Sequence, residues 1–103
     1  EILSVTSRYF AGKTVGSAHP NLRNITNLSF IHPQDIAQSD VLFLALPNGE
    51  SMYLLEKIIS KTKKIIDLGA DFRIKNKAEF YYWYRKIHPQ PSYLPKFIYG
   101  LVP

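Results

Sequence analysis

Two hydroxyls and a guanidinium stand side by side at Thr6, Ser7 and Arg8, directly after a short apolar stretch. Arginine suits a phosphate because it donates charge-assisted, bidentate hydrogen bonds. Proteins specific for NAD usually place an acid after such a stretch to hydrogen-bond a ribose hydroxyl, and that acid would repel a phosphate. The residue types therefore favour a dinucleotide with a 2′-phosphate. The alternative is a surface arginine in an ordinary turn.

A second candidate is the loop formed by Leu46, Pro47, Asn48 and Gly49, which follows the most apolar stretch of the chain. Glycine has no side chain to obstruct a ligand, so the backbone at Gly49 can approach a dinucleotide closely. The same residue types also form ordinary turns. The motif predicts cofactor contact only in combination with the other candidates.

A third candidate is the segment Asp67 to Arg73 (DLGADFR), in which Asp71 and Arg73 follow another apolar stretch. Arg73 could hold a substrate phosphate, with Asp71 orienting its guanidinium. We therefore name Asp71 and Arg73 as candidate substrate-binding residues. The alternative is that Asp71 caps the next turn while Arg73 forms a structural ion pair.

The elements expected to position these residues form a βαβ unit. The run Asp40 to Leu46 is almost unbroken in its apolar character, which is typical of a strand buried on both faces in a parallel sheet. An amphipathic helix is predicted over Glu50 to Lys63, and a second buried strand over Lys64 to Leu68. The fold class is therefore α/β. Ligands of such sheets bind at the carboxyl ends of the strands, where all three candidates lie.

The other elements are predicted with less regular patterns. Strands are expected over Ile2 to Thr6 and Leu28 to Ile31, separated by a long loop, and a helical turn over Pro33 to Ala37. An aromatic helix is expected over Lys77 to Arg85, and a last strand over Phe97 to Leu101. The aromatic side chains could stack on single-stranded nucleic acid, but we expect them to pack in the core.

Composition narrows the function. The 103 residues form one domain, their formal charge of +5 suits an anionic partner, and their longest apolar run is too short to span a membrane. There is no cysteine, which excludes a thiolate metal site and a cysteine nucleophile within these residues. His19, His32 and His88 each precede a proline and make a poor metal set. We expect no metal, no catalytic residue and no nucleic acid partner.

Several segments, taken in order, resemble one family, the N-acetyl-gamma-glutamyl-phosphate reductases, including the archaeal and Thermus-type branch that reduces aminoadipyl phosphate on a small carrier protein. The segments that carry the resemblance are VTSRYFAGK, HPNLR, DVLFLALPNG, IDLGADFR, the Trp83-Tyr84 pair and YGL. The resemblance implies a Rossmann-like domain that binds NADP, with Ser7 and Arg8 near the 2′-phosphate and Pro47 to Gly49 along the cofactor. The family commonly has histidine in place of Asn48 and serine in place of Gly69, which puts those side-chain contacts in doubt.

The resemblance also implies residues that this sequence does not contain. The family's glycine-rich turn, GASGYTG, does not precede Glu1, and the cysteine that attacks the acyl phosphate would follow Pro103, so we expect a domain that is incomplete at both ends. The full enzyme would form a thioester and reduce it with NADPH to a semialdehyde in arginine or lysine biosynthesis. An acidic amino-group carrier protein, a homo-oligomeric state and a cytoplasmic location are further expectations. The alternatives are a basic nucleic-acid-binding module or an aspartate-type semialdehyde dehydrogenase.

Overall fold

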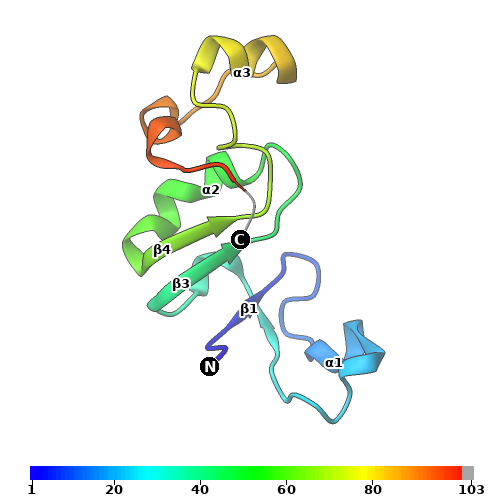
Figure 1. Cartoon of the computed structure of the whole chain (residues 1–103). Helices are drawn as coiled ribbons and strands as arrows, with labels where there is room; N and C mark the ends of the chain where they lie inside the picture. The colour runs from blue at the N-terminus through cyan, green and yellow to red at the C-terminus, as the bar shows by residue number, and fades with distance from the viewer. Residues whose placement is uncertain (101–103) are drawn as a thin grey trace.

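The computed structural model describes residues 1–100, and its centre is a βαβ unit. Strand β3 (Ser39–Leu44) leads through a loop into helix α2 (Ser51–Ile58), and strand β4 (Thr62–Asp67) then pairs with β3 in parallel (Figure 1). The register aligns Val41 with Lys64 and Leu44 with Asp67, so both strands end at the same edge. The predicted parallel pair is confirmed.

The boundaries of this unit differ from the sequence prediction. The α-helix ends at Ile58 rather than Lys63, and the 3₁₀ turn η3 (Ile59–Lys61) separates it from β4. Strand β4 starts at Thr62, two residues before the predicted Lys64. The apolar pattern did not reveal this start because the strand begins with polar residues, and Lys63 and Lys64 are exposed.

A second, smaller sheet joins β1 (Val5–Thr6) and β2 (Phe30–Ile31), also in parallel. Strand β1 is shorter than predicted because Ile2 and Leu3 form no pairing and remain largely exposed. The long loop between β1 and β2 contains two regular segments, the short helix α1 (Val15–Ala18) and the 3₁₀ turn η1 (Pro20–Leu22). The 3₁₀ turn η2 (Pro33–Asp35) is shorter than the predicted helical turn.

The C-terminal part of the described chain holds α3 (Lys77–Tyr84) and the 3₁₀ helix η4 (Pro91–Lys96), which lie beyond α2 on the side away from β1 (Figure 1). The Asn76 side chain caps α3 by accepting hydrogen bonds from two amides of its first turn. The strand predicted from Phe97 onward is wrong for residues 97–100, which have no strand partner, and Leu101 lies outside the described residues. None of the helices within residues 1–100 is long and apolar enough to cross a membrane.

Helix α2 contributes to two apolar clusters. Met52 and Leu55, which are fully buried, pack with the aromatic rings of Phe72 and Phe80 and with Leu94. Ile58 packs with two further side chains, Leu44 of β3 and Ile36 of the segment before it. Each such side chain stabilises the fold by about 1.5 to 3 kcal/mol when fully buried. The core therefore fixes α2 against β3 and against the segment after β4.

Only one face of the β3–β4 pair is covered within residues 1–100. Phe43 of β3 and Ile66 of β4 are 61% and 42% exposed, so the prediction of strands buried on both faces is wrong for the described chain. The expectation that the aromatic side chains of α3 pack in the core also fails for Tyr82 and Trp83, which are 60% and 65% exposed. This helix has only two turns, and Phe80 is its one buried residue.

Candidate functional site

The candidate site lies where β3 and β4 end, and Asp71 organises it. One carboxylate oxygen of Asp71 accepts a hydrogen bond of 2.7 Å from the Gly49 amide, and the other accepts one of 3.1 Å from the Met52 amide. These amides belong to the start of α2, where backbone donors lack helical partners and the helix dipole favours negative charge. Asp71 is 2% exposed. It therefore binds the loop before α2 to the loop after β4.

The backbone at Gly49 has a conformation that glycine favours. Its φ of +94° lies in the left-handed region, where a side chain would be strained. A Cβ built on Gly49 would also lie 2.9 Å from Nζ of Lys86, a residue that follows α3. Gly49 thus lets the ammonium of a distant lysine rest against the loop that the sequence predicts to line the cofactor.

A second carboxylate, Asp67, lies at the end of β4 beside the first. Its Oδ1 accepts hydrogen bonds from the Gly69 amide at 2.9 Å and from the Ser51 hydroxyl at 3.3 Å. Its Oδ2 is buried and has no hydrogen-bond partner in the described chain. Burial raises the pKa of Asp67 above its ordinary value, and the neighbouring charge of Asp71 adds to this effect.

His88 contacts the backbone of this network. Its Nε2 lies 2.9 Å from the backbone carbonyl of Asp71, and its Nδ1 accepts a hydrogen bond from the Gln90 amide, so Nε2 carries the proton of a neutral ring. The ring packs edge-on against Phe72 and Phe80. Burial lowers the pKa of His88, which favours this neutral form. The role visible for His88 is to hold the segment that carries Asp71.

The residues predicted after β1 reach the same place. Arg8 forms an ion pair with Glu50, its guanidinium lying 3.4 Å from Oε2, and Glu50 is the residue that precedes α2. The Ser7 amide donates to the carbonyl of Ile31 in β2, and the Ser7 hydroxyl oxygen accepts from the amide of Phe10. The loops after β1 and β3 therefore converge at the beginning of α2.

The structure thus brings together most of the predicted site and separates one member from it. Thr6, Ser7 and Arg8 lie at the end of β1, and the loop of Leu46, Pro47, Asn48 and Gly49 follows β3. Asp71 caps α2, which precedes it in the chain, and not the following turn. Arg73 is exposed and lies over the ring of Tyr99 at 5.3 Å, with no ion pair to Asp71 in residues 1–100.

Sequence reasoning missed three residues of this site: Asp67, Lys86 and His88. Asp67 is the first residue of the motif DLGADFR, but only the later residues Asp71 and Arg73 were named as candidates from the sequence. Lys86 carried no signal, because nothing in its local sequence shows that the chain folds back onto Gly49. Two surface hollows lie away from this site. One is lined by residues such as Leu3, Asp40 and Lys63 at the opposite end of the β3–β4 pair, and the other by residues around α1.

Comparison with known proteins adds an independent observation. Residues 1–102 match the model of the family described as semialdehyde dehydrogenase, NAD binding domain. The chain is 41% identical over 104 residues to a LysW-L-2-aminoadipate/LysW-L-glutamate phosphate reductase of Saccharolobus solfataricus. It is 39% identical over 104 residues to an N-acetyl-gamma-glutamyl-phosphate reductase of Desulforudis audaxviator. Each alignment covers 98% of this chain, and the chain spans 30% of the length of each relative.

Proposed function

Because the chain belongs to the family of semialdehyde dehydrogenase NAD-binding domains, we propose that it is the NADP-binding portion of an NADPH-dependent acyl-phosphate reductase that produces a semialdehyde. The observation that carries this proposal is the convergence of two strand-end loops at the start of α2, where Arg8 lies 3.4 Å from Glu50. Dinucleotides bind at this edge of parallel sheets. These 103 residues contain no cysteine nucleophile, and the role that we propose for them is binding of the cofactor.

The residues present fit a phosphorylated dinucleotide. The side chain of Arg8 is 57% exposed, and its only ion-pair partner in residues 1–100 is the partly exposed Glu50. A 2′-phosphate can therefore replace Glu50 as the anion that Arg8 binds, and Thr6 and Ser7 add hydroxyl donors. The absence of a side chain at Gly49 allows close approach of the ligand, and the Asp71 hydrogen bond keeps that loop in place. When bound, the cofactor supplies the hydride.

The roles of the remaining residues follow from their positions. Leu46, Pro47 and Asn48 form the loop along which the dinucleotide lies, and Asp71 acts by positioning that loop, because its carboxylate is buried on two amides. Its direct contact with substrate, expected from the sequence, stays a prediction. Arg73 is exposed and retains that expectation, with the acyl phosphate as its ligand.

The substrate class is proposed from the relatives. Their names specify N-acetyl-gamma-glutamyl phosphate or LysW-linked aminoadipate and glutamate phosphates. The formal charge of +5 is compatible with phosphorylated substrates and with an acidic carrier protein that delivers them. We therefore assign the full protein to arginine or lysine biosynthesis in the cytoplasm, and we expect it to be a homo-oligomer.

A cofactor titration of the full-length protein tests the proposal. Wild-type protein is expected to bind NADPH more tightly than NADH, and Arg8→Ala to weaken NADPH binding by about 10- to 100-fold, the loss of one charge-assisted contact, with NADH changed less than about twofold. Arg23→Ala is the matched control, since Arg23 is an exposed arginine that hydrogen-bonds the carbonyl of Gly16, away from α2. An unchanged ratio of the two affinities in Arg8→Ala would contradict the role of Arg8.

A further inference from the structure

We propose that Lys86 is a phosphate-binding residue of this site, whose ammonium holds a phosphate group of the ligand that passes over Gly49. The inference rests on the proposed function and adds a residue to it from a part of the chain that carries no recognisable motif. It assigns the site a second cation besides Arg8, from the opposite end of the described chain.

The geometry of Gly49 supports this assignment. The Lys86 ammonium occupies the space that a side chain at position 49 would fill, with Nζ 2.9 Å from the ideal Cβ position. Two backbone conformations make this possible: Gly49 has a φ of +94°, and Arg85, which ends α3, has a φ of +54°. The left-handed Arg85 turns the chain out of the helix just before Lys86. The contact therefore depends on the left-handed backbone at both residues, Gly49 and Arg85.

The Lys86 ammonium has no ion-pair partner among residues 1–100. The ammonium lies near the start of α2, the positive end of the helix dipole, which disfavours a cation. The ion pairs found among residues 1–100 are Arg8 with Glu50 and Lys63 with Asp40, so Lys86 has no carboxylate within ion-pair distance. Asp71, whose carboxylate is hydrogen-bonded to Gly49, already accepts two backbone amides. A bound anion would supply the missing counter-charge.

The hydrogen bonds of the loop explain why a side chain is needed. Phosphates at the start of a helix are commonly bound by free backbone amides. Here the Gly49 amide donates to Asp71 and is not available to a ligand. A lysine ammonium offers three donors and a full charge. The phosphate that it binds belongs either to the part shared by both dinucleotides or to the acyl-phosphate substrate.

The test uses full-length protein with Lys86→Ala and Lys86→Arg, and with Lys77→Ala as the matched control. Lys77 is an exposed lysine at the other end of α3. We expect Lys86→Ala to raise either the Kd for both NADPH and NADH or the KM for the acyl phosphate by about 10-fold, the effect of one lost charge-assisted contact. Lys86→Arg is expected to restore most of the loss. Circular dichroism melts confirm folding.

The outcomes separate the sources and the two proposals. Weaker binding of both dinucleotides assigns the cofactor phosphate, while a higher KM for the acyl phosphate at unchanged cofactor Kd assigns the substrate. Lys86→Ala indistinguishable from Lys77→Ala in all three constants overturns the inference and leaves the proposed function intact. Wild-type protein that binds neither dinucleotide overturns both.

Discussion

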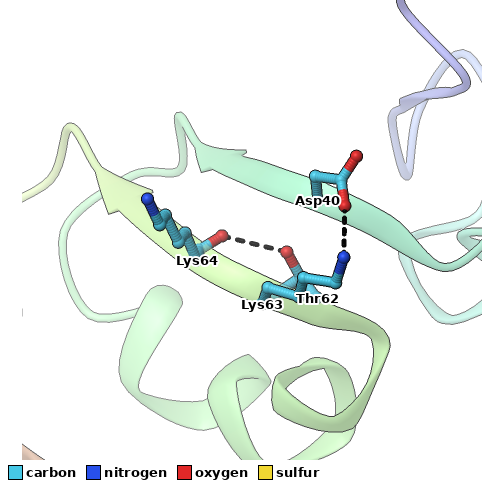
Figure 2. Close-up of polar contacts among 4 residues, drawn as sticks. All are labelled: Asp40, Thr62, Lys63 and Lys64. Atoms are coloured by element: carbon cyan, nitrogen blue, oxygen red, sulfur yellow. Dashed lines mark hydrogen bonds and ion pairs between the residues drawn. The ribbon is translucent and has the colours of Figure 1, made fainter.

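The two ends of the β3–β4 pair both carry aspartates, but the surroundings of these carboxylates differ. At the amino end, Asp40 forms an ion pair of 2.8 Å with Lys63, and the two side chains are 83% and 81% exposed. Figure 2 shows this pair beside the hydrogen bond, 2.9 Å long, that the Thr62 hydroxyl donates to the carbonyl of Lys64. At the carboxyl end, Asp71 is buried and bonds to backbone amides.

The difference shows that burial, more than a short distance to an opposite charge, decides how much a carboxylate stabilises the fold. An exposed ion pair gains little, because water and salt screen it and two long side chains lose freedom. A buried carboxylate that accepts backbone amides fixes the main chain, since losing it leaves those donors without partners. The carboxyl end therefore determines the shape of the candidate site, and the amino end does not.

The largest effect is expected for Asp71→Ala. Removing the carboxylate leaves the amides of Gly49 and Met52 unpaired at the start of α2, which should lower the free energy of unfolding by about 2 to 3 kcal/mol. Urea titration followed by circular dichroism measures this change, and NADPH binding should weaken as the loop loses its position. A loss as small as that of Asp40→Ala would remove the distinction between the two ends.

A smaller effect is expected at Gly49, with Gly12 as control. Both glycines have positive φ, +94° and +83°, so alanine at either should cost about 1 to 2 kcal/mol through backbone strain. Only at Gly49 does the new Cβ meet another group, the Lys86 ammonium, whereas nothing lies within 4 Å at Gly12. Thermal melts should therefore show similar losses, while a weaker affinity for phosphorylated ligand should appear in Gly49→Ala alone. Equal affinities of Gly49→Ala and Gly12→Ala for the phosphorylated ligand would show that Lys86 does not bind it.

The pH dependence of stability sharpens the comparison further. Because the pKa of Asp67 is raised in the fold, the unfolded chain loses this proton first, and the contribution of Asp67 falls as pH rises through the window that begins at 3.8. Because the pKa of His88 is lowered, its contribution is complete above pH 6.5 and is lost as pH falls below that value.

Two variants isolate these opposite signs. Relative to wild type, Asp67→Asn should gain stability as pH rises above 3.8, since it removes the buried charge. Wild-type protein loses the His88 contribution as pH falls below 6.5, and His88→Gln has no such contribution to lose. The difference in free energy of unfolding between His88→Gln and wild type should therefore shrink as pH falls below 6.5. Urea midpoints at a series of pH values measure both differences. Differences that do not vary with pH would show that neither group changes its proton affinity on folding.

The smallest effect is expected for Asp40→Ala. Its ion pair with Lys63 is exposed to solvent, so its removal should change the free energy of unfolding by less than about 0.5 kcal/mol. Urea titration in low and high salt provides the measurement. A loss above about 2 kcal/mol would mean that the exposed end also holds the fold.

Much of the fold could be predicted from the sequence. The apolar run after Asp40 predicted strand β3, and the amphipathic pattern around Leu55 predicted helix α2, because burial follows the periodicity of side chains. A second apolar run after this helix predicted the parallel strand β4. Arg8 and Gly49 could be named as candidate site residues because their chemistry and their position at strand ends are local properties. The family resemblance rested on the same local strings, and the match of residues 1–102 confirmed it.

Tertiary structure alone decided which of these residues meet. The cap that Asp71 provides for α2 spans 22 residues of sequence to Gly49, and the contact of Lys86 with Gly49 depends on the turn at Arg85. No local pattern encodes such contacts, because they arise where separate elements pack. Burial, which raises the pKa of Asp67 and lowers that of His88, is likewise a property of the packed chain, and the sequence determined only which groups could respond to it.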